Sequence, residues 1–341
     1  MTEFGIGVIG SGFMGRTYTE TVNKYCKRAR VRAVAVGSRA GQLAKDYGID
    51  LESSVESLVA RKDIHAVFIA TPHNVHADQS MAAARAGKHI LLEKPMACTV
   101  ADCDAILDAC KREKVQCSIA FTQRTRICNM RARQIIEGGR IGKIQQIAST
   151  QLLGGGVGTL PGWQSDSANL GTLFGHGIHN FDSIRWLSGQ EIKTVYAKCT
   201  SFEPAVKVEG SSMVLMTLSG GTFASLWSSF QLAKPSFPRS QFAARIVGEK
   251  GLIDLDAYGE LRLAVDGQWR VVETQPPIDW QGKGFLDPVR LESYVRQCQD
   301  VIDACIENRS PAVTGWDGRQ AVAAALAAYE SSRTGKEIVL S

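Results

Sequence analysis

The stretch Gly5-Ile6-Gly7-Val8-Ile9-Gly10-Ser11-Gly12-Phe13-Met14-Gly15 decides the fold. An apolar run breaks into Gly10-x-Gly12-x-x-Gly15 and then continues into helix-compatible sequence, which predicts a strand, a tight turn and a helix start. In such a turn the first glycine allows the bend, the second lets backbone N–H groups approach a pyrophosphate, and the third lets helix and strand pack closely. Because the motif follows an N-terminal strand, the context favours dinucleotide binding over an ordinary glycine turn. The expected cofactor contacts in this turn are Gly10, Gly12, Phe13, Met14 and Gly15.

The composition is typical of a soluble globular enzyme of two domains. The 341 residues are 44% hydrophobic and 21% charged, and the net charge of +5 is dispersed, unlike the clustered basic stripe of a nucleic-acid binder. No apolar run approaches the roughly 18 residues of a membrane span, and the chain enters a strand without a secretory signal, so we expect a cytoplasmic protein. The nine cysteines are an odd number without a CxxC pair, which favours reduced packing residues over disulfides or a metal site.

The sequence that follows the glycine turn predicts alternating strands and helices. The expected strands are Val31–Val36, His65–Ala70, Lys88–Leu92 and Val115–Phe121, and the expected helices between them are Ala77–Ala86 and Val100–Glu113. An NAD enzyme usually has an acidic residue after the second strand, where this chain has Gly37-Ser38-Arg39. Ser38 and Arg39 would bind a 2′-phosphate, which favours NADP over NAD, although Arg39 as a solvated helix-start charge is the alternative.

Two loops are expected beside the nicotinamide half of the cofactor, because ligands bind beyond the carboxyl ends of parallel strands. Thr71, Pro72, His73, Asn74 and His76 follow one strand, with helix packing as an equal alternative for His76. Glu93 and Lys94 follow the next strand, and Pro95 ends it, with a cis bond as one expectation.

The second half of the chain predicts an antiparallel sheet. Strand-like runs recur without regular intervening helices at Ile144–Leu152, Ile192–Thr200, Ser212–Leu218, Thr222–Trp227, Gln241–Gly248, Leu252–Asp256 and Leu261–Ala264. A helix interrupts them at Asp182–Leu187, and long helical stretches follow at Leu291–Glu307 and Trp316–Arg333.

Four motifs together resemble the glucose–fructose oxidoreductase, inositol dehydrogenase and rhizopine-catabolism (Gfo/Idh/MocA) family. They are Gly10-x-Gly12-x-x-Gly15, Ala70-Thr71-Pro72-x-x-x-His76, the string from Ala86-Gly87-Lys88-His89 to Glu93-Lys94-Pro95, and Gly175-x-Gly177-x-His179-x-x-Asp182. The resemblance implies an α/β Rossmann NAD(P)-binding domain over residues 1–122 and an α+β domain over 123–341. This second domain would carry a large, mostly antiparallel open sheet for substrate binding and oligomerisation, and its C-terminal helices would pack back on the first domain. A homodimer or homotetramer is the expected assembly.

The resemblance also implies an NAD(P)-dependent dehydrogenase or reductase with Lys94 and His179 as catalytic residues. A lysine buried beside the oxidised nicotinamide would have a lowered pKa, and histidine suits a proton shuttle. The family usually has an aspartate four residues before the histidine, where this chain has Gly175. Its absence puts the usual sugar chemistry in doubt and leaves two substrate branches open, a sugar or polyol and a carboxylated cyclic cis-diol.

The expected substrate-binding residues are Arg124, Arg126, Trp163, His176 and Asn180. Arginines bind carboxylates bidentately, which favours an anionic substrate, whereas a solvated helix face is the alternative reading of this cationic segment. No histidine and carboxylate constellation has metal-ligand spacing. Two other functions stay open, an NAD-dependent glycoside hydrolase working by transient oxidation and elimination, and a non-catalytic cofactor-binding regulator.

Overall fold

The computed structural model describes residues 3–160, 162, 170–204, 206–235 and 237–340. The chain forms two compact units, residues 1–122 with 278–319 and residues 123–277 with 320–341. The division between them falls inside one helix, α9 (Gly315–Thr334).

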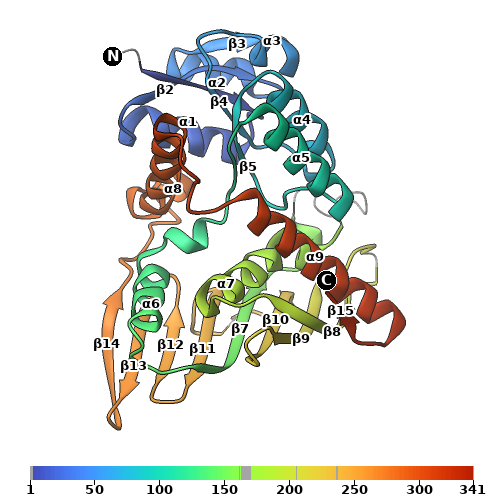
Figure 1. The fold of residues 1–341 in the computed structure, drawn as a ribbon, viewed down its shortest axis with the longest axis vertical. Helices are drawn as coiled ribbons and strands as arrows, with labels where there is room; N and C mark the ends of the chain where they lie inside the picture. The colour runs from blue at the N-terminus through green and yellow to red at the C-terminus, as the bar shows by residue number, and fades with distance from the viewer. Residues whose placement is uncertain (1–2, 161, 163–169, 205, 236, 341) are drawn as a thin grey trace. The chain divides into compact units, whose positions relative to one another are not determined.

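The first unit is a doubly wound α/β domain. Its six-stranded sheet has the order β3-β2-β1-β4-β5-β6 and every pairing in it is parallel, so the carboxyl ends of all six strands lie along one edge. Figure 1 shows this sheet with helices around it. The elements are β1 (Phe4–Ile9), α1 (Phe13–Tyr25), β2 (Ala29–Ala35), α2 (Ala40–Tyr47), β3 (Asp50–Glu52), α3 (Val55–Val59), β4 (Ala66–Ile69), α4 (His76–Arg85), β5 (His89–Leu92), α5 (Val100–Glu113), β6 (Cys117–Ile119) and α8 (Pro288–Glu307).

The core of the first unit joins helix α8 to the N-terminal strand and helix. Tyr294, Cys298 and Val301 of α8 pack in one buried cluster with Ile6 of β1 and Tyr18 of α1. A segment far along the chain therefore stabilises the element that carries the glycine turn.

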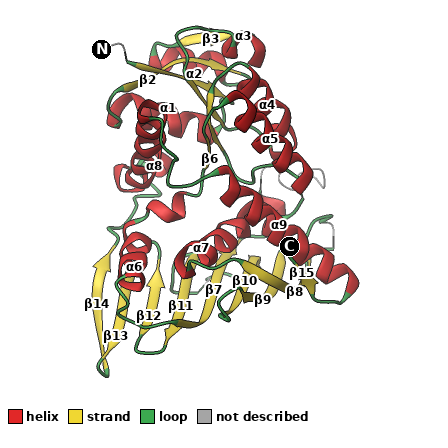
Figure 2. Cartoon of the chain, in the orientation of Figure 1, coloured by secondary structure: helices red, strands yellow, loops and turns green. Residues whose placement is uncertain are grey.

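The second unit contains a nine-stranded sheet of order β14-β13-β12-β11-β7-β10-β9-β8-β15. Its pairings are antiparallel except for β10 with β7, which run parallel. Figure 2 separates its strands from its helices by colour. The elements are α6 (Ile127–Glu137), β7 (Ile144–Gly154), α7 (Ile178–Ser188), β8 (Ile192–Thr200), β9 (Ser211–Leu218), β10 (Phe223–Leu232), β11 (Phe242–Gly248), β12 (Leu252–Asp256), β13 (Glu260–Val265), β14 (Gln268–Thr274) and β15 (Ile338–Val339).

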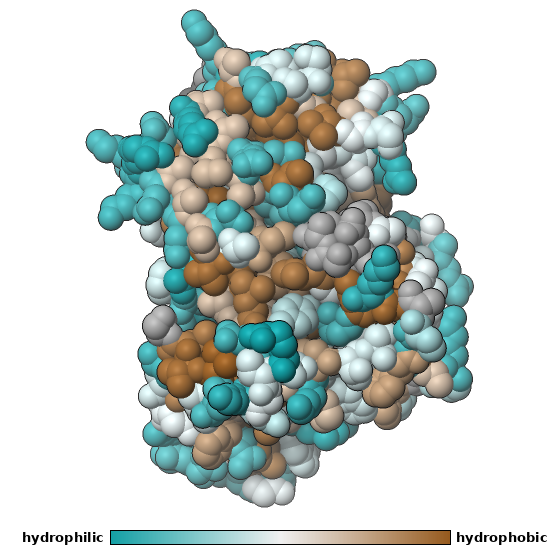
Figure 3. Space-filling model, turned by 90° about the vertical axis from the view of Figure 1, so that its right-hand side faces the viewer, coloured by the Kyte–Doolittle hydropathy of each residue, from teal (hydrophilic) through white to brown (hydrophobic). Residues whose placement is uncertain are grey.

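Helices cover one face of this sheet. α6 and α7 lie against it (Figure 1), and Ser331 and Ser332 near the end of α9 accept hydrogen bonds from backbone N–H groups of β8. Alternate residues of the central strands point to the other face and remain exposed, including Met213, Leu215, Phe223 and Trp227. Elsewhere hydrophobic side chains also reach the surface among hydrophilic ones, as the face in Figure 3 shows.

The predicted fold class, a parallel α/β domain followed by a mostly antiparallel open sheet, is confirmed. The nine cysteines are free and six of them are buried, as expected for packing residues. The prediction omitted the edge strand β14, the short strands β3 and β15, and helices α3 and α6. Among the described residues, no helix is long and apolar enough to cross a membrane.

Candidate active site

The three glycines of the turn between β1 and α1 serve different purposes. Gly10 has φ +107°, and a Cβ there would collide with the Ala70 carbonyl group. A Cβ on Gly15 would collide with the carbonyl oxygen of Gly10. Around Gly12, in contrast, no atom lies within 4 Å of the position a Cβ would take. The chain itself therefore needs Gly10 and Gly15, whereas the open space at Gly12 fits the close approach of a pyrophosphate.

The start of α1 offers the partial positive charge that phosphates need. Gly12 is its N-cap and no side chain caps the helix, so the first backbone N–H groups are available to a ligand. The side chains of the next two residues are engaged within the protein: the Phe13 ring lies 3.7 Å from that of Phe285, and Met14 Sδ lies 3.9 Å from Arg290 Nη2. The residues present thus fit a dinucleotide through their backbone.

The end of β2 presents Ser38 and Arg39 to solvent. The chain turns there with φ +94° at Gly37, and the backbone N–H of Arg39 donates to Ser11 Oγ at 3.2 Å. This hydrogen bond ties the end of β2 to the glycine turn. No carboxylate stands at residues 36–39 to repel a 2′-phosphate.

The loop after β4 is held by a buried histidine. His76 Nδ1 lies 2.8 Å from the Pro95 carbonyl oxygen and Nε2 lies 2.9 Å from that of Thr71. Burial lowers the pKa of His76, although both carbonyl groups favour its charged form. We expected His76 either to contact the cofactor or to pack at the helix start, and its fully buried ring contacts the two loops that carry Thr71 and Pro95. His73 is buried in a short 3₁₀ turn, and Asn74 is exposed.

Lys94 follows β5 in a cis Lys94–Pro95 peptide and lies beside a buried carboxylate. The Tyr18 hydroxyl donates to Glu93 Oε1 at 2.5 Å, and the Lys94 backbone N–H donates to Glu93 Oε2 at 3.2 Å. Burial lowers the pKa of the Lys94 ammonium group, and the charge of Glu93 opposes that change in part. Burial also raises the pKa of Glu93. Lowering the pKa of a lysine favours its neutral amine, which is the form that can accept a proton.

His179 lies in the first turn of α7, after a π-helical turn over Leu173–Gly177. Its side chain is 9% exposed, and its ring stands edge-on to Phe242 at 5.7 Å. His176 packs against the Phe230 ring at 4.5 Å instead. The two histidines therefore contact different aromatic residues of the second unit.

Glu209 and Tyr329 hold the turn that precedes His179, and the sequence analysis missed both. The Glu209 carboxylate accepts from the Leu173 backbone N–H at 2.6 Å and from the Tyr329 hydroxyl at 3.0 Å. Burial raises the pKa of Glu209 to about 7. Neither residue belongs to a recognisable motif, because the contacts join a loop, the π-helical turn and helix α9, which are far apart in sequence.

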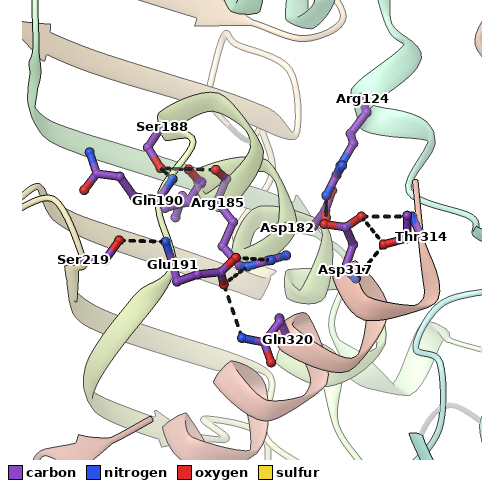
Figure 4. Close-up of polar contacts among 11 residues, drawn as sticks. Arg124, Asp182, Arg185, Ser188, Gln190, Glu191, Ser219, Thr314, Asp317 and Gln320 are labelled. Atoms are coloured by element: carbon purple, nitrogen blue, oxygen red, sulfur yellow. Dashed lines mark hydrogen bonds and ion pairs between the residues drawn. The ribbon is translucent and has the colours of Figure 1, made fainter. Parts of the chain in front are cut away.

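Arg124 is engaged by a buried carboxylate. Its Nε and Nη2 atoms donate to Asp182 at 2.9 and 2.5 Å, and both side chains are buried (Figure 4). Arg185 likewise pairs with Glu191, which also accepts from Gln320 (Figure 4). We expected Arg124 to bind substrate, and the bidentate pair shows that it also links the segment before α6 to α7.

The remaining expected substrate residues have different surroundings. Asn180 is buried, and its amide donates to Ser149 Oγ at 2.8 Å, so it ties α7 to β7. Arg126 is 2% exposed and its guanidinium carbon lies 3.8 Å from the centre of the Tyr258 ring. Trp163 lies outside the described residues. Among the described residues no group of His, Cys, Asp and Glu could hold a metal ion.

Two family descriptions match consecutive parts of this chain. The family description "Oxidoreductase family, NAD-binding Rossmann fold" matches residues 4–121, and the GFO/IDH/MocA C-terminal domain matches residues 129–254. The chain is therefore an NAD-binding oxidoreductase. It belongs to the Gfo/Idh/MocA family, as its motifs predicted, and the expected enzyme class, a dehydrogenase or reductase acting on CH–OH groups, is confirmed.

Named relatives are similar over most of their length. Inositol 2-dehydrogenase 2 of Saccharopolyspora erythraea is 28% identical over 97% of this chain and 93% of its own. Levoglucosan dehydrogenase of Pseudarthrobacter phenanthrenivorans is 32% identical over 65% of this chain and 60% of its own. A solved structure of levoglucosan dehydrogenase in complex with NADH superposes with a TM-score of 0.87 at 26% identity, covering 99% of both chains.

Proposed function

We propose that this enzyme transfers a hydride between nicotinamide and the hydroxyl or carbonyl carbon of a small cyclic substrate, with Lys94 and His179 handling the proton. The observation that carries the proposal is the environment of Lys94. Lys94 comes directly after the parallel strand β5, at the carboxyl edge of the sheet. Burial lowers the pKa of its ammonium group. The relatives named inositol 2-dehydrogenase and levoglucosan dehydrogenase support a sugar or polyol, and a carboxylated cyclic cis-diol is the second branch.

Each catalytic residue has a defined task in this proposal. The cofactor, when bound, supplies the hydride acceptor or donor. Lys94 Nζ accepts the proton of the reacting hydroxyl in oxidation and returns it in reduction, while Glu93 and Tyr18 hold the lysine backbone in place. His179 relays the proton, and the Phe242 ring limits the orientations of its imidazole. His73 and Asn74 line the nicotinamide side, and His176 contributes to the substrate side.

The test of this proposal compares Lys94→Ala with Lys111→Ala, an exposed lysine on α5. Nicotinamide absorbance is followed with a panel of inositols, anhydrosugars and carboxylated cis-diols. Loss of a general base typically lowers turnover by about 10² to 10⁴ fold, so Lys94→Ala should lose kcat while keeping cofactor affinity. Unchanged turnover in Lys94→Ala, at the level of Lys111→Ala, would reject Lys94 as the base.

We further propose a preference for NADP over NAD. Support comes from Ser38 and Arg39, which are exposed at the end of β2 where NAD enzymes usually place a carboxylate. A charge-assisted hydrogen bond to phosphate contributes about 1.5 kcal/mol or more, so Arg39→Asp should weaken NADP binding at least about tenfold. Arg30→Asp, which changes an exposed arginine of β2, should leave the affinity unchanged. Fluorescence titration with NADPH and NADH measures both, and an NADPH affinity that survives Arg39→Asp would contradict the assignment.

The proposed assembly is a homodimer or homotetramer formed through the sheet of the second unit. Its support is the exposed sheet face with Met213, Leu215, Phe223 and Trp227, which no described helix covers. We propose the cytoplasm as the compartment, consistent with the nine free thiols.

A further inference from the structure

Arg126 is a buried cation with unused donors. It is 2% exposed, and within the described residues its Nε and Nη1 atoms have no hydrogen-bond partner. It does not take part in an ion pair with any described carboxylate. A guanidinium group presents donors in a fixed planar fork that matches a carboxylate.

The other buried arginines of the described chain differ from Arg126. Arg124 pairs with Asp182 and Arg185 with Glu191. Arg290 donates to the Phe285 carbonyl group and to the Tyr294 hydroxyl. Each of these three guanidinium groups has hydrogen-bond or ion-pair partners within the protein. Burial of an arginine without such partners is therefore not a general feature of this fold.

The described residues only partly compensate the charge of Arg126. An arginine side chain keeps its charge at physiological pH, so it cannot lower the cost of burial by losing a proton. Its guanidinium stacks on Tyr258 with the carbon 3.8 Å from the ring centre, and a cation–π contact offsets only part of the cost of removing a charge from water. Arg126 also stands at the N-cap of α6, which no side chain caps, so the helix adds positive potential rather than removing it.

A series of aromatic contacts connects Arg126 to His179. The Tyr258 ring stacks on Phe242 at 6.0 Å, and Phe242 meets the His179 ring edge-on at 5.7 Å. The Tyr258 hydroxyl accepts from Gln123 Nε2 at 3.3 Å, which fixes the ring under the guanidinium. All of these residues belong to the second unit. Arg126 and the proposed catalytic residue His179 therefore contact opposite ends of the ring pair formed by Tyr258 and Phe242.

We propose that Arg126 binds a carboxylate group of the substrate, so that the enzyme acts on an anionic cyclic alcohol rather than on a neutral sugar. The inference rests on the proposed function for the reaction, but the anion site can be tested without turnover. It selects the carboxylated branch of the two substrate classes, and it makes Arg126 the residue that discriminates between them.

The first experiment measures thermal unfolding of the cofactor-free protein at constant ionic strength. The probes are cyclohexanecarboxylate, the uncharged cyclohexanecarboxamide and inorganic phosphate. The carboxylate should raise the Tm of the wild type by a few degrees in a saturable way, and the amide should not. Arg126→Met should abolish this shift while its own Tm without ligand stays equal to or above that of the wild type, because an uncompensated buried charge is removed. Arg131→Met, an exposed arginine of the same helix, should keep the shift.

The second experiment is kinetic and compares a carboxylated cyclic cis-diol with its carboxamide. Arg126→Met should raise the KM of the carboxylate at least tenfold and leave that of the carboxamide within twofold, whereas Arg126→Lys should lie between. Equal losses for both substrates would overturn the proposal. It would also be overturned if phosphate alone stabilised the wild type, or if Arg126→Met lowered the Tm and kept the carboxylate shift. Absence of turnover with an intact, Arg126-dependent carboxylate shift would refute the proposed reaction and leave the anion site standing.

Discussion

Gly12 and Gly15 stand three residues apart in one turn, yet the absence of a side chain has a different cause at each. A Cβ at Gly15 would overlap the backbone of Gly10, so the fold excludes it. A Cβ at Gly12 would meet no protein atom within 4 Å, so only a ligand can exclude it. The motif predicts a different role for each of the two positions, and the space around each glycine agrees with that prediction.

This difference gives a prediction for two alanine variants. Gly15→Ala should destabilise the protein by about 1–3 kcal/mol, as overpacked sites do. Gly12→Ala should cost less than about 1 kcal/mol, since an N-cap glycine is only modestly better than alanine, but should weaken binding of NADP and NAD by more than about tenfold. Thermal unfolding and NADPH titration of both variants provide the check. Equal Tm losses with equal affinities would show that Gly12 does not face the pyrophosphate.

For individual residues, the sequence predicts which side chains follow a strand, but it does not predict the buried partners that hold them. The sequence places Glu93 and Lys94 directly after a strand, and in the structure the buried Glu93 carboxylate accepts from the Tyr18 hydroxyl and from the Lys94 backbone N–H. His76 and Arg124 make buried contacts within the protein that the sequence did not specify. Partners such as Pro95 and Asp182 are distant in sequence, so composition and spacing carry no signal for these contacts.

At the scale of elements, hydrophobic periodicity predicted the buried helices and strands. Helix Val100–Glu113 and strands Ile192–Thr200 and Leu252–Asp256 have the predicted bounds. The omitted strand β14 lies at the edge of the sheet and is mostly exposed, so its residues lack an alternating apolar pattern. The predicted helix at Asp182–Leu187 begins earlier, at Ile178, and a π-helical turn precedes it.

Glu209, which holds this π-helical turn, makes the free energy of unfolding depend on pH. Its carboxyl pKa is raised from 4.5 to about 7 in the folded protein because of burial. The proton is bound more tightly in the folded state, so the stabilisation is complete below about pH 4.5 and is lost as pH rises through about 7. The loss amounts to at most about 3.5 kcal/mol, given about 1.4 kcal/mol per pKa unit.

Between pH 5.5 and pH 8, the free energy of unfolding of the wild type should fall relative to that of Glu209→Gln, because only the wild type loses the stabilisation from Glu209. Urea denaturation of the wild type and of Glu209→Gln at both pH values measures the difference between them. Glu330→Gln, an exposed residue on α9, should behave as the wild type. A wild-type and a Glu209→Gln protein with the same pH dependence would rule out this role of Glu209.

At the scale of the whole molecule, the exposed sheet face of the second unit predicts self-association. Met213 and Leu215 are 64% and 61% exposed, and Trp227 lies opposite Met213 on the neighbouring strand. Apolar groups that gather on one face of a sheet favour burial against a second copy of that face. The resemblance to a family with oligomeric members led to the same expectation from the sequence.

Leu215→Glu tests this association directly. A charge in the centre of the face should shift the sedimentation coefficient from that of a dimer or tetramer toward that of a monomer. Leu51→Glu, which introduces a charge at an exposed apolar residue of the first unit, should leave the assembly intact. If the wild type sediments as a monomer, the sheet face does not mediate oligomerisation.

The most direct measurement of the proposed reaction follows the hydrogen on the reacting carbon. The enzyme is incubated with NADP⁺ and a carboxylated cyclic cis-diol that carries deuterium on its two carbinol carbons, and the products are analysed by mass spectrometry. The account predicts one deuterium in the reduced nicotinamide for each diol oxidised, with the signal lost in Lys94→Ala and retained in Lys111→Ala. Oxidised diol without deuterium in the nicotinamide, or the same deuterium transfer in Lys94→Ala, would contradict it.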